Sequence, residues 1–139
     1  MTFSDWLLAL HVVSAIIVIG SLTALWTLIL ATRPAAPMIA AESANSFGRV
    51  FGPLVGAAMM GAIVFGVWLA IDDDAYQVWD GWIIASLLLW AVSMAAGVRA
   101  GQEFERDPVA RRQVGIRLQT LSSLAVLAIL LLMIWKPGA

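Results

Sequence analysis

The residue in this chain with the clearest capacity for chemistry is His11, the only histidine among 139 residues. It lies in the stretch LLALHVVSAIIVIGS, an apolar run that predicts part of a membrane-crossing helix. An imidazole placed there can bind a metal ion or serve as the axial ligand of a b-type haem. It can also stay neutral and bond to a hydroxyl or carbonyl of a neighbouring helix, or act as an interfacial anchor. The sequence leaves these interpretations open.

A haem or metal ion held by His11 needs a further ligand, because the chain supplies one histidine. This ligand could be His11 of a second subunit. It could also be Met133, which counting along a helix places near the same level of the last apolar stretch. We therefore predict His11 and Met133 as candidate ligands of haem b or of a metal ion. Cysteine is absent, which excludes thiolate metal sites and cysteine nucleophiles.

The other polar side chains considered in the apolar stretches are hydroxyls, and they do not form a catalytic constellation. No Asp, Glu, Lys or Arg lies within these stretches, whereas proton-coupled transporters commonly use carboxylates there. A Ser–His–Asp arrangement is not indicated either. These features favour a non-catalytic role over an enzyme. The hydroxyls in question belong to Ser14, Ser21, Ser86, Ser93, Thr120, Ser122 and Ser123.

The elements that hold these residues follow from the distribution of apolar residues. Hydrophobic residues make up 62% of the chain and charged residues 12%, whereas soluble domains are about half apolar and about a quarter charged. Four uncharged stretches, residues 6–32, 50–71, 81–98 and 118–135, are each close to the roughly 20 residues that a helix needs to cross a bilayer. We therefore predict one all-α integral membrane domain over residues 1–139, built as a four-helix bundle in contact with lipid.

The basic residues lie almost entirely in two of the connecting segments. Seven of the eight are arginines between the first and second stretches or between the third and fourth, so these segments are expected on the cytoplasmic side. The opposite side carries the acidic segment IDDDAYQVWD and most of the tryptophans. We predict an up-down-up-down bundle in the inner (cytoplasmic) membrane, with both termini outside. The outer tryptophans are Trp6, Trp68, Trp79, Trp82 and Trp135, whereas Trp26 and Trp90 are exceptions.

The segment between the third and fourth stretches predicts a helical hairpin that projects into the cytoplasm. Its turn is expected near Arg106 and Asp107, because Asp107 followed by Pro108 is typical of a helix N-cap. Glu103 and Glu105 are placed to meet arginines, which predicts a solvated face of mutually neutralising charges. The alternative is contact with lipid headgroups or a partner protein through Arg111, Arg112 and Arg117.

Small residues recur every four positions in the second stretch. This spacing lets helix backbones approach closely, which drives helix association in lipid. We predict close packing within the bundle, with a homodimer seam as the alternative. The residues concerned are Gly48, Gly52 and Gly56, followed on a second stripe by Ala58, Ala62, Gly66 and Ala70.

The stretch LALHVVSAIIVIGS, followed by LTALWTLILATR, resembles the opening of a group of small bacterial four-helix proteins known as predicted integral membrane proteins. The matching positions are Leu10, His11, Ser14 or Ala15, and Gly20. A histidine early in the first helix followed by a glycine is more distantly similar to the membrane domains of the copper-resistance protein D family and of HemJ-type protoporphyrinogen oxidases. That resemblance implies copper handling or haem binding, although this sequence lacks the further histidines of both families.

Two classes of function therefore remain. One is a non-catalytic accessory, assembly or scaffold component that contacts itself or another membrane protein. The other is a haem- or metal-binding redox protein centred on His11. A small-molecule permease assembled as an oligomer is a third alternative. The net charge of −1 argues against nucleic acid as a partner, because duplex binding requires clustered basic residues.

Overall fold

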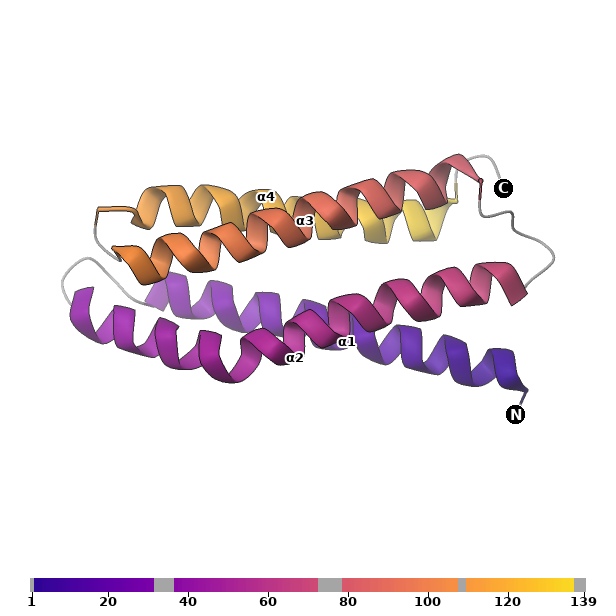
Figure 1. Ribbon diagram of the computed structural model, residues 1–139, viewed down its shortest axis with the longest axis horizontal. Coiled ribbons are helices and arrows are strands. Elements are labelled where there is room, and N and C mark those ends of the chain that lie inside the picture. The colour runs from indigo at the N-terminus through magenta and orange to yellow at the C-terminus, as the bar shows by residue number, and fades with distance from the viewer. Residues whose placement is uncertain (1, 32–36, 73–78, 108–109, 137–139) are drawn as a thin grey trace.

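The structure is a computed structural model that describes residues 2–31, 37–72, 79–107 and 110–136, with the backbone alone for residues 37–45 and 47–50. Within these ranges the chain forms four helices: α1 spans Phe3–Ala31, α2 Pro37–Asp72, α3 Gly81–Arg106 and α4 Arg112–Trp135 (Figure 1). Each helix contains a segment long and apolar enough to cross a membrane. The prediction of four such helices is thereby confirmed, and the described residues include no strand.

The helices are longer than the apolar stretches that predicted them. α2 begins at Pro37 rather than near Val50, and proline suits the first position of a helix, where the backbone N–H has no helical partner. α3 continues past Val98 to Arg106, as predicted, because most of the polar residues there are good helix formers. Hydropathy marks the part of a helix that crosses lipid and misses its polar extension.

The helices pack as two pairs, α1 with α2 and α3 with α4, and each pair forms one layer of the molecule (Figure 1). Ser4 near the start of α1 donates a hydrogen bond to the carboxylate of Asp72 at the end of α2. Ser93 of α3 and Ser122 of α4 hold their hydroxyl oxygens 2.9 Å apart at the centre of the second pair. The backbones of the two pairs are in contact at fewer positions.

α2 changes direction along its length in Figure 1. Pro53 lies inside this helix. Proline has no N–H to donate to the carbonyl one turn earlier, and its ring crowds that carbonyl, so a helix bends at such a position. The longer C-terminal part of α2, from Phe51 to Asp72, is the part that is apolar enough to cross a membrane.

The turn between α3 and α4 centres on Glu103. Its carboxylate lies 3.4 Å from the Arg106 guanidinium and 2.7 Å from that of Arg111, and the hydrogen bond from Arg111 raises the pKa of this guanidinium. Asp107 Oδ1 accepts a backbone N–H within the turn at 2.8 Å. The predicted turn near Arg106 and Asp107 is confirmed. The prediction that Asp107 is the N-cap of the fourth helix is wrong, because Arg111 takes that position.

The small residues of α2 divide into two groups. Ala58 and Ala70 are buried within the chain. Gly52 and Gly56 differ from them, because a Cβ built on either glycine would meet no neighbouring atom within 4 Å. Among the residues that the structure describes, no other helix therefore packs against these two glycines. Gly48 lies where only the backbone of α2 is described, so its contacts are outside the described side chains.

Candidate functional site

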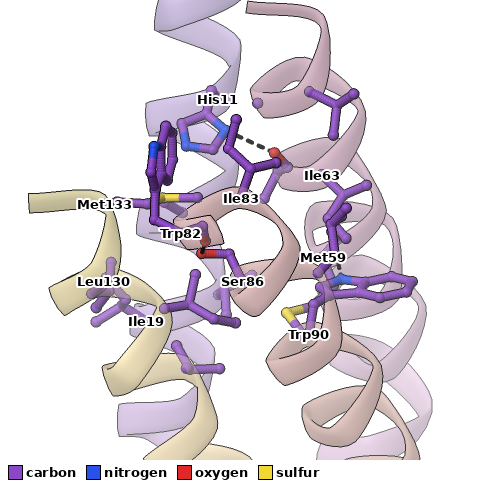
Figure 2. A pocket seen from close by; sticks show the side chains of 18 residues that line it. His11, Ile19, Met59, Ile63, Trp82, Ile83, Ser86, Trp90, Leu130 and Met133 are labelled. Carbon is purple, nitrogen blue, oxygen red and sulfur yellow. Dashed lines mark hydrogen bonds between the residues drawn. The ribbon is translucent and has the colours of Figure 1, made fainter. Parts of the chain in front are cut away.

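The side chain of His11 is half-buried on α1 and reaches across to the backbone of α2. Its Nδ1 lies 2.7 Å from the carbonyl oxygen of Ala62 (Figure 2). A carbonyl oxygen can only accept a hydrogen bond, so Nδ1 must carry the proton. In the neutral imidazole, Nε2 then has an available lone pair, because only one of the two ring nitrogens is protonated.

Gly66 makes this contact sterically allowed. A Cβ built on Gly66 would lie 2.9 Å from Cε1 and 3.0 Å from Nδ1 of His11, closer than side chains pack. Ala62 and Gly66 are one helical turn apart, so the absence of a side chain at Gly66 exposes the carbonyl of Ala62 to the ring. The carbonyl has a second lone pair beyond the one used in the helix. His11, Ala62 and Gly66 thus form one structural unit.

The imidazole lies at one end of a cavity of about 100 Å³ between the two helix pairs. All four helices contribute to its walls, which are almost entirely apolar. Figure 2 shows His11 near Trp82 and Met133 at this end, with Trp90 and Met59 farther along. The cavity is partly enclosed and combines one polar end with a long apolar wall.

Five residues of α3 line this cavity, and three of them recur every four positions on one side of the helix. These three are Trp82, Ser86 and Trp90. The Ser86 hydroxyl donates to the carbonyl of Trp82 at 2.7 Å, so this hydroxyl is bonded to its own helix. Trp82 was predicted as part of the outer aromatic belt, but its side chain is buried beside Ala70 and Ile83. Trp82 thus lies near the start of its helix and is covered by other helices of the bundle.

The two tryptophans that did not fit the aromatic belt join the helix pairs. Trp26 Nε1 on α1 donates to the Ser123 hydroxyl on α4 at 2.9 Å. Trp90 Nε1 on α3 donates to the carbonyl of Met59 on α2 at 3.2 Å. An indole N–H in an apolar layer needs an acceptor, and each of these tryptophans finds one on a helix of the other pair. They provide polar links across a largely apolar interface.

The other in-span hydroxyls with described hydrogen bonds mainly link helices or bond to their own helix. Ser93 is only 1% exposed and lies in a reciprocal pair, because each of the Ser93 and Ser122 hydroxyls also bonds to the carbonyl of the other residue. Thr120 and Ser123 donate to carbonyls one turn earlier on α4. Such bonds satisfy hydroxyl groups within helices without forming a pore.

The structure brings together the two predicted ligands, since His11 and Met133 line the same cavity. An imidazole and a thioether are a ligand pair that suits copper(I). Among the described residues, no three side chains of the types His, Cys, Asp and Glu are grouped so that they could hold a metal ion. A cavity of about 100 Å³ does not fit a haem, because sites for much smaller drug-sized ligands already occupy roughly 300 Å³ or more.

The three arginines predicted to contact headgroups have different environments. Arg111 pairs with Glu103, and Arg112 Nη2 donates to the carbonyl of Ile29 near the end of α1 at 3.0 Å. Arg117 is exposed. The contact of Arg112 was missed, although a cation next to the negative end of a helix dipole is a common arrangement. Lipid contact by these residues stays a prediction.

Two positions that lie inside the bundle were also missed. Gly61 of α2 lies against α1, because a Cβ built there would be 2.9 Å from the Ser14 hydroxyl oxygen. It falls between the two four-residue stripes and so did not stand out as a packing position. Gln119 of α4 is only 4% exposed. Its place inside an apolar stretch was the available signal, because a polar side chain there is normally directed toward the bundle.

Comparison with known proteins supplies no assignment for this arrangement. No family model, curated protein or solved structure matches the chain. The similarity of residues 8–33 to small four-helix membrane proteins therefore stays a prediction. The candidate site stands on its own geometry: a histidine oriented by a carbonyl at the polar end of an apolar cavity.

Proposed function

We propose that this chain is a multi-pass protein of the bacterial inner membrane, with four helices running up-down-up-down and both termini outside. The arginines of the two cytoplasmic segments support this orientation. The contacts that join the start of α1 to the end of α2 support consecutive helices of opposite direction.

Cysteine labelling tests this orientation, because the chain has no native cysteine. Trp79 is 83% exposed before α3, and Ala110 is exposed in the turn before α4. In intact cells we expect the Trp79→Cys variant to react with a membrane-impermeant maleimide and the Ala110→Cys variant to react only after permeabilisation. The reverse pattern would place both termini in the cytoplasm.

Within the membrane we propose a non-catalytic role, as an accessory or assembly component that holds a small molecule or a partner protein. The observation that carries this proposal is the use of polar side chains inside the bundle. The His11 imidazole, the indole N–H groups of Trp26 and Trp90, and the hydroxyls of Ser93 and Ser122 all bond to other helices. Side chains used in this way stabilise and orient a scaffold.

A second candidate is a metal-binding redox protein, and one observation favours it. A histidine that binds a metal usually donates its other ring N–H to a carbonyl or carboxylate, which orients the ring and sets its tautomer. The bond from His11 Nδ1 to Ala62 has this form, and Met133 lies in the same cavity. If copper is held here, His11 Nε2 and the Met133 thioether are the residues of this chain that would hold it.

The absorbance spectrum and metal content of the purified protein distinguish the two candidates. The proposed non-catalytic role predicts no Soret band and no stoichiometric metal, in the wild type and in His11→Ala alike. A Soret band or one bound copper ion per chain in the wild type, lost in His11→Ala, would replace this proposal with the redox alternative. The helical circular dichroism of both samples serves as the folding control.

A further inference from the structure

The cavity between the helix pairs has two features that together define a ligand class. Its polar end presents the imidazole of His11, whose Nδ1–H is committed to the carbonyl of Ala62. The neutral ring therefore offers Nε2 as a hydrogen-bond acceptor. An acceptor at the end of an apolar cavity selects a molecule with a hydroxyl donor at the end of an apolar body.

The size of the cavity limits the body of this molecule. A protein cavity of ~150 Å³ binds a benzene molecule and stays free of water. The cavity next to His11 is smaller, at about 100 Å³, and is partly open, so the part of a ligand that it encloses is no larger than a single six-membered ring. A macrocycle or a pair of fused rings exceeds this space.

The side chains on the wall favour an aromatic ring over an alkyl chain. Trp82 and Trp90 present indole groups, and Met59 and Met133 present thioethers. Aromatic rings pack against each other with a favourable edge or offset geometry, and sulfur next to a ring adds a further attraction. An alkyl chain would gain only the burial of its apolar surface.

We propose that this cavity binds the hydroxylated single ring of a membrane-soluble phenol or hydroquinone, whose O–H donates to His11 Nε2. The proposal deepens the proposed non-catalytic role, on which it rests, by naming the class of small molecule that is held. Gly66 has a defined part in it, because the absence of a side chain there allows the ring of His11 to take the required position.

Two fluorinated probes of similar size test the proposal by ¹⁹F NMR titration of the purified protein in detergent. 4-Fluorophenol carries the hydroxyl, and 4-fluorotoluene replaces it with a methyl group. We measure the ratio of their affinities and correct for partition into empty micelles. One added hydrogen bond predicts that the wild type prefers the phenol by roughly fivefold. 1-Hexanol as a competitor distinguishes a ring site from a site for any alcohol, because it should displace the phenol only weakly.

The variants locate this preference. His11→Phe removes the acceptor and keeps a ring, so we expect the preference for 4-fluorophenol to disappear. Gly66→Ala places a Cβ 2.9 Å from Cε1 of His11 and should have the same effect by displacing the imidazole. Gly20→Ala is the matched control, because a Cβ there meets no neighbouring atom within 4 Å and the preference should remain.

An affinity ratio near one in the folded wild type, or an equal ratio in the wild type and His11→Phe, would overturn the proposal. Strong displacement by 1-hexanol would overturn the choice of a ring. If His11→Phe or Gly66→Ala fails to fold, the affinity ratio in the wild type and in Gly20→Ala still decides whether the phenol is preferred. These outcomes are separate from the test of the non-catalytic role, which a Soret band or stoichiometric copper overturns and a lost phenol preference does not.

Discussion

The close approach of His11 to Gly66 predicts that a larger residue at Gly66 lowers the free energy of unfolding. A Cβ at Gly66 would lie 2.9 Å from the imidazole, so we expect Gly66→Ala to force the ring away from the Ala62 carbonyl. Overpacking of this kind typically costs about 1–3 kcal/mol. Alanine is the better helix former by about 1 kcal/mol, which offsets part of this cost.

The matched substitution Gly20→Ala separates the two effects. It has the same gain in helix propensity and meets no neighbouring atom within 4 Å. Thermal melts in detergent should therefore show a lower melting temperature for Gly66→Ala and an unchanged or higher one for Gly20→Ala. Equal shifts in both variants would contradict the close approach of His11 to α2.

The residues of this site could be predicted only in part. His11 stood out because it is the single imidazole in an apolar stretch. Its partner is the backbone of Ala62, and a carbonyl group is present at every position, so no residue type indicates which one is used. Gly66 was predicted as a packing residue, and the sequence did not indicate that the element packed against it would be the histidine ring.

At the scale of helices, the reciprocal serine pair links α3 to α4. Ser93→Ala removes the hydroxyl that bonds to both the hydroxyl and the carbonyl of Ser122. Bonds of this kind between membrane helices are worth about 0.6–2 kcal/mol, so we expect a loss of unfolding free energy of that order. A double variant with Ser122→Ala should lose less than the sum of the single variants, because the two hydroxyls share a bond.

Chemical denaturation in mixed micelles can measure the coupling free energy between Ser93 and Ser122. Thr120→Ala is a suitable control, because Thr120 is exposed and its hydroxyl bonds only to its own helix. We expect the control to stay within about 0.5 kcal/mol of the wild type. Additive effects of the two serine substitutions would indicate that each hydroxyl acts alone through its carbonyl bond.

The helices themselves were the most predictable part of the structure. Long uncharged stretches predict membrane-crossing helices because backbone groups cannot remain unpaired in lipid. Their polar extensions were less predictable, as α2 illustrates. This helix begins at Pro37, in a segment that is too polar for hydropathy to place within the membrane. The pairing of Ser93 with Ser122 was also not indicated, because each residue alone is equally suited to bond to its own helix.

At the scale of the whole molecule, the two helix pairs meet with an apolar cavity between them. The sequence predicted a four-helix bundle but did not predict this cavity. The cavity exists because the side chains of the four helices do not fill the space between the two helix pairs completely. How well they fill it depends on the shapes and rotamers of side chains such as Met59 and Trp90. Hydropathy and charge patterns contain no such information.

The exterior of the molecule leads to the last prediction, which concerns Gly52 and Gly56. Both lie on the bent helix that contains Pro53, where Gly52 is exposed, Gly56 is half-buried, and a Cβ on either would meet no described neighbouring atom within 4 Å. Small residues four apart let a second helix approach closely, and no other helix of this chain does so at these positions. We therefore expect a second copy to pack there, in keeping with the homodimer seam that the glycine spacing suggests.

The Gly56→Leu variant tests this seam, because its bulk would hold two backbones apart while meeting no neighbouring atom near its own Cβ. We expect light scattering in detergent to give the mass of a dimer for the wild type and of a monomer for Gly56→Leu. Gly20→Leu, which replaces another open glycine on α1, should leave the mass unchanged. If all three proteins have the same mass, Gly52 and Gly56 face lipid, and the small residues of α2 that pack against other helices are Gly61, Gly66 and the buried alanines.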